Sequence, residues 1–357
     1  MKISRIEVTP VSIPLERVVS GSTFTKDVRR TVVVAVETDT GIRGRTYAGD
    51  ERDQQAELVE CLTGELAPEA IGAELLAIER LWERLFAGST AASDRHVYMH
   101  ALGALDIAVW DAIGKALDQQ LYRLWGGYRE SVPVIATGGY YGDDLGLAEE
   151  VEAYEQMDLA GIKLKVGGAS VEEDLDRLRT VRDVAAEEFV VACDANRGWS
   201  AEQAIAFGRV ASELDVEWFE EPVVWHDQYR GMAAVRRQTG LPVCAGQNEA
   251  TPSGCQLLME SDAVDLLNFD ASEGGGPTAW RRVAAAASLS GVTMGHHEEP
   301  HVAMHLLASV PHGRYVECFH PDIDPVWYRM VENTPTPSDG RIELPDGPGL
   351  GLRLDEQ

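Results

Sequence analysis

From about residue 130 onward, short apolar runs alternate with longer amphipathic segments at a spacing of roughly 25 residues. Short apolar runs are typical of buried strands, and apolar residues that recur every three or four positions are typical of helices covering a core. This rhythm predicts an α/β fold with a (β/α)8 barrel, and an open doubly wound sheet is the alternative. The expected strands are residues 132–137, 162–166, 189–194, 216–220, 242–247, 264–270, 292–297 and 314–318.

The residues before this rhythm have another pattern. The stretch "RTVVVAVETDTGIRGRTYAG" predicts a strand, a turn and a second strand, and from about residue 54 to 122 the apolar spacing is helical. We therefore expect an N-terminal α+β capping domain over residues 1–128 and a barrel domain over 129–325. The remaining segment, 326–357, is rich in Pro and Gly, and we expect it to pack back on the capping domain.

Composition narrows the classes of partner. The chain has 357 residues, and 59 Asp and Glu against 31 Lys and Arg give a net charge of -28. Nucleic acids and anionic membranes are bound mainly through Lys and Arg, so we expect a small-molecule partner instead. We find no apolar run long enough to span a membrane, no signal-peptide pattern, and five scattered cysteines without CxxC spacing. These features predict a cytoplasmic protein with reduced thiols.

Polar and charged residues follow the ends of most expected barrel strands. Each one alone has a simpler explanation, such as a helix cap, a turn or a structural histidine. Their recurrence at successive strand ends favours a functional site, because active sites of such barrels lie at the C-terminal ends of the strands. In strand order they are Lys163 and Lys165, Asp194 and Asn196, Glu220 and Glu221, Gln247 and Glu249, Asp270, His296 and His297, and Glu317.

The oxygen-bearing side chains among these suit a magnesium site. Asp194, Glu220 and an oxygen from the fifth strand would converge at the barrel mouth, and hard oxygen ligands suit Mg2+. We favour Gln247 as the third ligand. Glu249, with the same strand parity, is the alternative if it reaches back or acts through a water molecule. A glutamine carries no charge, so this site should bind Mg2+ more weakly than one with three carboxylates.

The remaining residues suit the removal of an α-proton from a carboxylate. A metal ion stabilises the negative charge that forms, and a base must then take the proton. We expect Lys165 to be the base, with Lys163 disfavouring its charged form and holding the substrate carboxylate. His297, oriented by Asp270, would be the acid or base on the opposite face. Glu317 would donate a hydrogen bond to the substrate if it is protonated.

The order of the motifs "KLK", "DAN", "EEP", an Asp before a Gly-rich turn, and a His on the seventh strand resembles the enolase superfamily. Within it, the chain is similar to the mandelate racemase/muconate lactonizing enzyme family, mandelate racemase subgroup. The resemblance implies a capping domain on a barrel, Mg2+ dependence and a homo-oligomer. It also implies metal ligation by Asp194 and Glu220, a Lys-x-Lys motif, an Asp270–His297 dyad and an acid at Glu317. The sequence departs from the family at Gln247, where a Gly-Glu pair or an Asp is usual.

Two reactions are compatible with these residues. If His297 protonates a leaving β-hydroxyl, the enzyme is a dehydratase, and if it returns a proton to the α-carbon, a racemase or epimerase. Hydroxyl side chains in the segment 18–28 favour a sugar-acid dehydratase. The racemase or epimerase of a 2-hydroxy or amino acid is the alternative, and a catalytically silent barrel with a degraded metal site is the third. The expected substrate contacts are Ser20, Ser22, Phe24, Tyr47, Asn196 and His296.

Overall fold

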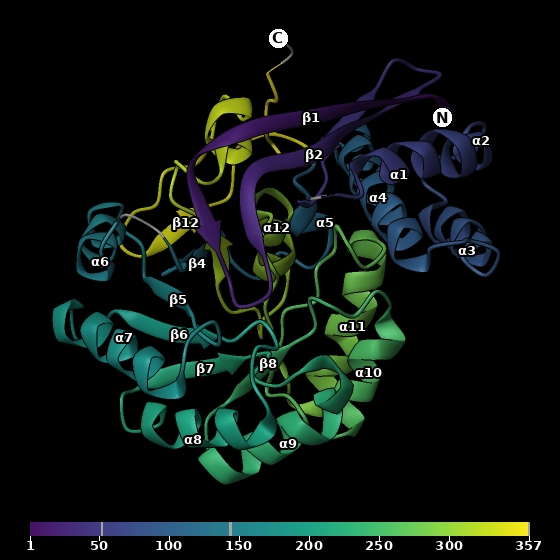
Figure 1. Ribbon diagram of the computed structural model, residues 1–357. Helices are drawn as coiled ribbons and strands as arrows, with labels where there is room; N and C mark the ends of the chain where they lie inside the picture. Colours follow the sequence, from purple (N-terminus) through teal and green to yellow (C-terminus); the bar gives the residue numbers. More distant parts are fainter. Residues whose placement is uncertain (51–52, 143–144, 356–357) are drawn as a thin grey trace.

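The computed structural model describes residues 1–50, 53–142 and 145–355 (Figure 1). Within these ranges the parallel strands β4 to β11 are neighbours in the order β10-β9-β8-β7-β6-β5-β4-β11. The ring closes where Met294 N donates to His312 O at 2.9 Å and Arg314 N donates to Met294 O at 2.8 Å. The predicted barrel is thus confirmed, and the open sheet is wrong. The strands are β4 (Ser131–Gly138), β5 (Gly161–Lys165), β6 (Val190–Asp194), β7 (Val216–Glu220), β8 (Val243–Ala245), β9 (Leu266–Leu267), β10 (Thr293–Met294) and β11 (Val316–Cys318).

A helix follows each of the strands β4 to β10 and covers the outside of the ring (Figure 1). Two of them start with a capping box, in which Ser170 pairs with Glu173 and Ser200 with Gln203. In the described chain after β11, the π-helical turn η3 (Val326–Met330) and the strand β12 (Arg341–Glu343) take the place of an eighth helix. The helices are α6 (Leu147–Gln156), α7 (Val171–Val184), α8 (Ala201–Ala211), α9 (Gln228–Thr239), α10 (Pro252–Glu260), α11 (Gly276–Ser290) and α12 (Pro300–Ser309).

The N-terminal region forms an antiparallel sheet and a helical layer beside the barrel. The long hairpin of β1 and β2 extends from this sheet toward the barrel (Figure 1). Helix α4 is buried almost all round because it packs against both β3 and α11. No helix in the described ranges is long and apolar enough to cross a membrane. The elements are β1 (Ile3–Ser20), β2 (Thr25–Thr38), β3 (Arg43–Tyr47), α1 (Gln55–Glu60), η1 (Cys61–Leu66), α2 (Ala67–Ala70), α3 (Ile78–Gly88), α4 (Arg95–Ala116) and α5 (Leu121–Leu124).

The chain after η3 returns to the N-terminal region. Leu350 N donates to Asp111 Oδ1 of α4 at 2.8 Å, and Leu121 N of α5 donates to Gly349 O at 3.0 Å. These hydrogen bonds hold the C-terminal segment against α4 and α5. The division into a capping domain, a barrel and a C-terminal segment at the expected bounds stays a prediction.

The barrel interior has an apolar layer beneath its mouth. Ile135, Ala192, Trp218, Cys244 and Leu266, from five different strands, form a separate buried cluster. Side chains two residues further along a strand point the same way. The inward positions above this apolar layer are therefore where the polar side chains of the next section lie.

Candidate active site

Three of the predicted site residues lie at one level of the barrel. In the strand register, Asp194 is the partner of Lys165 on β5 and of Glu220 on β7. The Lys165 ammonium donates to Asp194 Oδ2 at 2.6 Å. Asn196 holds the same carboxylate, because its backbone N donates to Oδ1 at 2.8 Å and its Nδ2 to Oδ2 at 3.2 Å. Asp194 is thereby fixed among groups that favour its charged form.

Lys163 is fully buried and ties two carboxylates together. Its ammonium donates to Glu220 Oε1 at 2.8 Å and to Glu317 Oε1 at 2.6 Å. Burial alone would lower the pKa of Lys163, but Glu220, Glu317 and Asp194 raise it well above the usual value. In this structure the ammonium of Lys163 contacts carboxylates of the protein, and its expected contact with the substrate carboxylate stays a prediction.

Glu220 is fully buried among these charged groups. Burial raises its pKa to about 8, although Lys163 acts in the opposite direction. Its Oε1 also accepts from Asn268 Nδ2 at 2.9 Å, and its Oε2 accepts from Trp218 Nε1 at 3.2 Å. Asn268 was not among the predicted site residues. Asn268 lies two positions before Asp270, and side chains two apart on a strand point the same way. This alternation is the sequence feature that could have identified Asn268.

Gln247 lies beside Glu220 at the mouth of the barrel. Its Nε2 donates to Glu221 Oε2 at 3.0 Å, while its Oε1 accepts from Asn268 Nδ2 at 3.4 Å. Asn268 Nδ2 therefore reaches oxygens of both Gln247 and Glu220. The structure thus connects Gln247 to Glu220 through Asn268, which agrees with Gln247 as the fifth-strand ligand.

Glu249 lies elsewhere, which corrects the second alternative. Strand β8 ends at Ala245, and Glu249 N donates to Gly246 O in a turn, so the alternation used to infer its direction no longer applies. Its Oε1 accepts a hydrogen bond from Gln228 Nε2 of α9. This contact holds the carboxylate against the outer helix and not against Glu220.

His297 and Asp270 form a pair on another side of the barrel. His297 Nδ1 lies 3.0 Å from Asp270 Oδ2, and Asp270 Oδ1 accepts from the Ser272 backbone N and Oγ, both at 2.7 Å. Burial would lower the pKa of His297, but Glu298 and Asp270 raise it to about 10. The histidine is therefore oriented by Asp270 and is held in its protonated form.

His296 points away from the cavity that His297 faces. Its Nε2 accepts from Ala271 N at 2.9 Å, and its Nδ1 lies 2.9 Å from His297 O. Burial lowers its pKa, so it stays neutral and supports the backbone of two loops. The prediction that His296 contacts substrate is corrected, since consecutive residues project in different directions.

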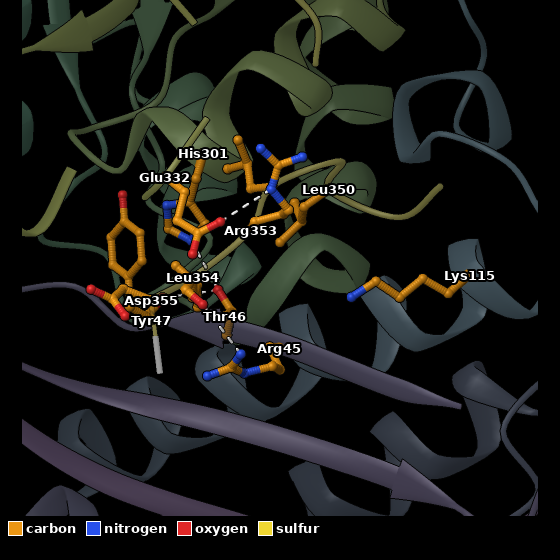
Figure 2. A pocket seen from close by; sticks show the side chains of 11 residues that line it. Arg45, Thr46, Tyr47, Lys115, His301, Glu332, Leu350, Arg353, Leu354 and Asp355 are labelled. Carbon is orange, nitrogen blue, oxygen red and sulfur yellow. Dashed lines mark hydrogen bonds and ion pairs between the residues drawn. The ribbon is translucent and has the colours of Figure 1, made fainter. Parts of the chain in front are cut away.

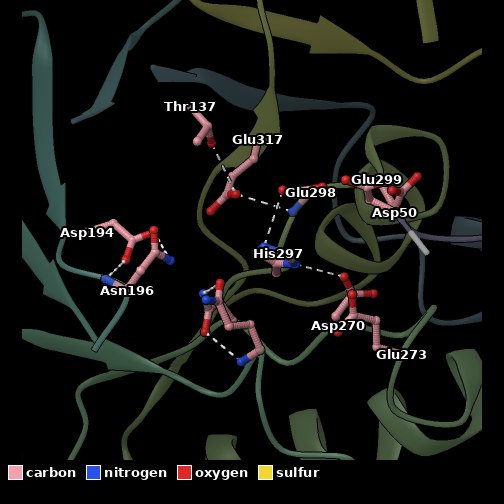
Figure 3. A network of polar contacts seen from close by, with 12 residues as sticks. Asp50, Thr137, Asp194, Asn196, Asp270, Glu273, His297, Glu298, Glu299 and Glu317 are labelled. Atoms are coloured by element: carbon pink, nitrogen blue, oxygen red, sulfur yellow. Dashed lines mark hydrogen bonds and ion pairs between the residues drawn. The ribbon is translucent and has the colours of Figure 1, made fainter. Parts of the chain in front are cut away.

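Glu317 and Glu298 meet beside this pair (Figure 3). Glu317 Oε2 accepts from Thr137 Oγ1 at 3.3 Å and from Glu298 N at 3.2 Å. Glu317 Oε1 is occupied by Lys163. Both of its oxygens therefore accept hydrogen bonds from protein groups, and a hydrogen bond from Glu317 to the substrate stays a prediction.

A cavity of about 320 Å³ lies between the N-terminal region and the barrel mouth. Lys165 and His297 both line it, and Phe24 and Asn196 are the predicted substrate contacts that reach it. Among the described residues that line it, only Phe24 has a hydrocarbon side chain. Sequence reasoning did not identify the lining residues Asp53, Gln54, His96, His100, Arg197, Asn248, Glu273 and Glu298. Thr23, Asp50 and the proposed ligand Gln247 complete the lining.

The two predicted serine contacts have other tasks. Ser22 Oγ donates to Ala195 O at 2.8 Å and so fastens the β1–β2 tip to the loop after β6. Ser20 Oγ lies 2.9 Å from Thr25 Oγ1 within the hairpin. The expected substrate contacts of both serines stay predictions, and in this structure the two hydroxyls bond to nearby protein groups. They hold the segment that places Phe24 over the cavity.

Tyr47 lines a different cavity, of about 520 Å³ (Figure 2). It is buried against the ring of His301, with ring centroids 3.8 Å apart. Arg45, Lys115 and Glu332 share this second cavity, which Lys165 and His297 do not line. The expectation of a substrate contact at Tyr47 is therefore corrected, because its strand position turns the ring into the core.

A buried ion-pair cluster joins the N-terminal region to the barrel. Arg29 of β2 is 2 % exposed, and its guanidinium lies 2.5 Å from Glu299 Oε1 and 3.6 Å from Asp50 Oδ1. Lys26 Nζ lies 2.7 Å from Asp50 Oδ2. Glu298 and Glu299 both have positive φ, so the loop after β10 takes a strained path to present these acids.

The chemistry of these side chains fits a hard divalent cation. Oxygens of Asp194, Glu220 and Gln247 gather around the buried ammonium groups and Asn268. Asn196 Oδ1 is buried beside Asp194 and has no hydrogen-bond partner among the described residues. Two carboxylates and neutral amide oxygens form a donor set that Mg2+ accepts.

Comparisons with known proteins agree with this architecture. Residues 4–126 match the mandelate racemase/muconate lactonizing enzyme N-terminal domain, and residues 146–357 match an enolase C-terminal domain-like model. The chain is 30% identical to 3,6-anhydro-alpha-L-galactonate cycloisomerase of Streptomyces coelicolor, over 91% of this chain and 89% of the relative. It is 28% identical to arabinonate dehydratase of Saccharolobus solfataricus, over 78% and 76%.

A solved structure is similar over nearly the whole chain. It is a mandelate racemase/muconate lactonizing enzyme from a marine actinobacterium in complex with magnesium, 47% identical, with a TM-score of 0.94 and coverage of 99% of this chain and 97% of that chain. The two family matches together cover most of the sequence. This chain belongs to the mandelate racemase/muconate lactonizing enzyme family of the enolase superfamily.

Proposed function

We propose that this protein is a Mg2+-dependent dehydratase that removes the α-proton and the β-hydroxyl of a sugar acid. The observation that carries the proposal is that Lys165 and His297 line one polar cavity from different strands of the barrel. Strands β5 and β10 are separated by β4 and β11 along the shorter path around the ring. A substrate between them would meet a base and an acid on different faces.

Asp194, Glu220 and Gln247 would hold the metal ion. When bound, Mg2+ supplies a Lewis acid that stabilises negative charge on the substrate carboxylate. Lys163 donates hydrogen bonds to Glu220 and Glu317 and so keeps both carboxylates in place. The relatives crystallised with magnesium support the choice of ion.

The protein side chains would move two protons. Lys165, as the neutral amine, takes the α-proton on Nζ and becomes the ammonium. His297 gives the proton on Nε2 to the β-oxygen, the C–O bond breaks, and water leaves. Asp270 keeps Nδ1 of His297 protonated through both steps. The resulting enol becomes a 2-keto-3-deoxy acid when a proton adds at the β-carbon.

The walls of the cavity support a polyhydroxylated substrate. Apart from Phe24, the described lining residues offer hydrogen-bond donors, acceptors or charges, which suit hydroxyls better than an aromatic ring. Asp50, Asp53, Glu273 and Glu298 add several carboxylates. These four carboxylates outnumber the cationic side chains of Lys165, Arg197 and His297 in the same cavity, so we propose a mono-acid sugar. The relative named arabinonate dehydratase supports this class.

A racemase or epimerase is the second candidate, because the same two-sided arrangement can return a proton to the α-carbon. In that case His297 protonates carbon and no water is lost. The position of Lys165 and His297 alone permits both outcomes. The polar lining is what favours dehydration.

The experiment is a substrate screen with purified protein and Mg2+ in D2O. The panel contains matched sugar mono-acids and diacids together with small 2-hydroxy acids, and mass spectrometry follows deuterium gain and water loss. Loss of water from mono-acid sugars, absent in Lys165→Ala and present in the exposed control Lys2→Ala, supports the proposal. Deuterium exchange without water loss identifies the racemase or epimerase. If the panel shows no reaction while Mg2+ binds normally, the proposed substrate class is wrong.

A further inference from the structure

Three side chains with metal-binding chemistry lie outside the group of Asp194, Glu220 and Gln247. His96 and His100 are four residues apart on α4, so they share one face of the helix. Glu273 belongs to the loop between β9 and α11, and all three line the cavity of Lys165 and His297. A pair of histidines at this spacing on a helix is a common basis of metal sites.

The distances among these atoms suit one ion. One ligand atom from each of the three residues lies within 4.8 Å of the others. His100 Nε2 is 3.3 Å from Glu273 Oε1, and the rings of His96 and His100 have centroids 5.2 Å apart. Two ligands at about 2.0–2.1 Å from a tetrahedral Zn2+ are themselves about 3.3–3.4 Å apart. His100 and Glu273 therefore already have the required spacing.

The packing fixes this pair while leaving the third ligand free to adjust. His100 is 5 % exposed, and a Cβ on Gly103, one turn further along α4, would clash with the backbone oxygen of Ser272. The glycine thus allows the loop that carries Glu273 to lie directly on the helix. His96 is exposed, so its ring can turn toward an ion without disturbing the core.

We propose that His96, His100 and Glu273 form a second cation site, which takes a divalent transition metal such as Zn2+. Imidazole ligands favour Zn2+ over Mg2+, whereas Asp194, Glu220 and Gln247 offer oxygen only. The ion would join the cap helix α4 to the barrel loop and present an open coordination position to the cavity. Its binding does not depend on the proposed reaction, since it requires only these three side chains.

The test is calorimetric titration of the chelator-treated full-length protein with Zn2+ in the presence of saturating Mg2+. The wild type should bind one Zn2+ that Mg2+ does not displace. The variants His96→Gln and Glu273→Gln should each weaken this binding at least about tenfold. His226→Gln, a change of an exposed histidine outside the cavity, is the matched control and should leave the binding unchanged.

Three results would overturn the site. The first is no Zn2+ binding by the wild type under saturating Mg2+, and the second is equal weakening by His96→Gln and His226→Gln. The third is loss in His297→Asn but not in His96→Gln, because Asp270, Glu273 and His297 form a neighbouring group that shares Glu273. His96 is exposed, so His96→Gln should fold normally. Anomalous scattering at the zinc edge from soaked crystals gives an independent reading of the position.

Discussion

Gln247 Nε2 donates a hydrogen bond to Glu221 Oε2 at 3.0 Å, and this contact leaves the amide oxygen of Gln247 facing Asn268. A glutamate at this position would place two buried carboxylates against each other. We therefore predict that Gln247→Glu lowers the melting temperature of the metal-free protein. It should also lower the Kd for Mg2+ about tenfold, because the ion then gains a charged ligand.

The matched control is Gln228→Glu. Gln228 donates a hydrogen bond to Glu249 in the same way, but on the outer side of the barrel. This change should destabilise the protein without altering Mg2+ affinity. Calorimetry and thermal unfolding, each with and without chelator, measure both effects. Equal Mg2+ affinity in wild type and Gln247→Glu would contradict the placement of Gln247 in the metal site.

Arg29 links the capping region to the barrel through buried charges. Removing it with Arg29→Met leaves Glu299 and Asp50 without their guanidinium partner. Breaking a buried pair in this way typically costs about 3–5 kcal/mol of unfolding free energy. The double variant Arg29→Met/Glu299→Gln should recover part of this loss. Urea unfolding measures both variants, and an unchanged unfolding free energy in Arg29→Met would contradict a stabilising role of this buried ion-pair cluster.

We predict that the buried side chain of His305 makes the protein less stable in acid. Its Nδ1 accepts from Tyr122 N at 3.3 Å, its Nε2 donates to Leu350 O at 3.0 Å, and burial lowers its pKa to about 4. Between pH 6.5 and 4 the unfolded chain binds a proton here that the folded chain does not. Stability therefore falls as the pH falls, by up to about 1.4 kcal/mol per pH unit from this group.

The measurement is the unfolding free energy at several pH values in this window. His305→Gln should be less stable than the wild type near neutral pH and should show a pH slope smaller by about one proton. His226→Gln, exposed on η2 (Trp225–Asp227), should keep the full slope. Identical slopes in the wild type and His305→Gln would show that His305 does not carry this dependence.

The barrel was predictable because its strands are buried on both faces and recur with a regular period. Each expected run contains one of the strands β4 to β11 or overlaps it closely. The same periodicity placed Asp194 and Glu220 at one level, since both end strands of regular geometry. Strand parity failed for Glu249 because the chain turns after Ala245.

The cap side of the site was not predictable from local pattern. His96 and His100 lie on a helix whose other residues are mostly apolar and buried. The sequence of this helix therefore indicates a core helix and not a binding site. Tyr47 was assigned to the cavity from its place after a hairpin, but its strand faces the core. Contacts such as Arg29 with Glu299 join residues 270 positions apart. No local sequence pattern specifies such a contact.

The central claim is that Lys165 and His297 handle protons on different faces of one substrate. His297→Asn, incubated in D2O with Mg2+ and a mono-acid sugar that the wild type dehydrates, tests it most directly. Because Lys165 remains, the variant should still exchange the α-proton for deuterium, while water loss should fall by about 10²–10⁴. Water loss at the wild-type rate, or loss of α-exchange as complete as in Lys165→Ala, would contradict the account.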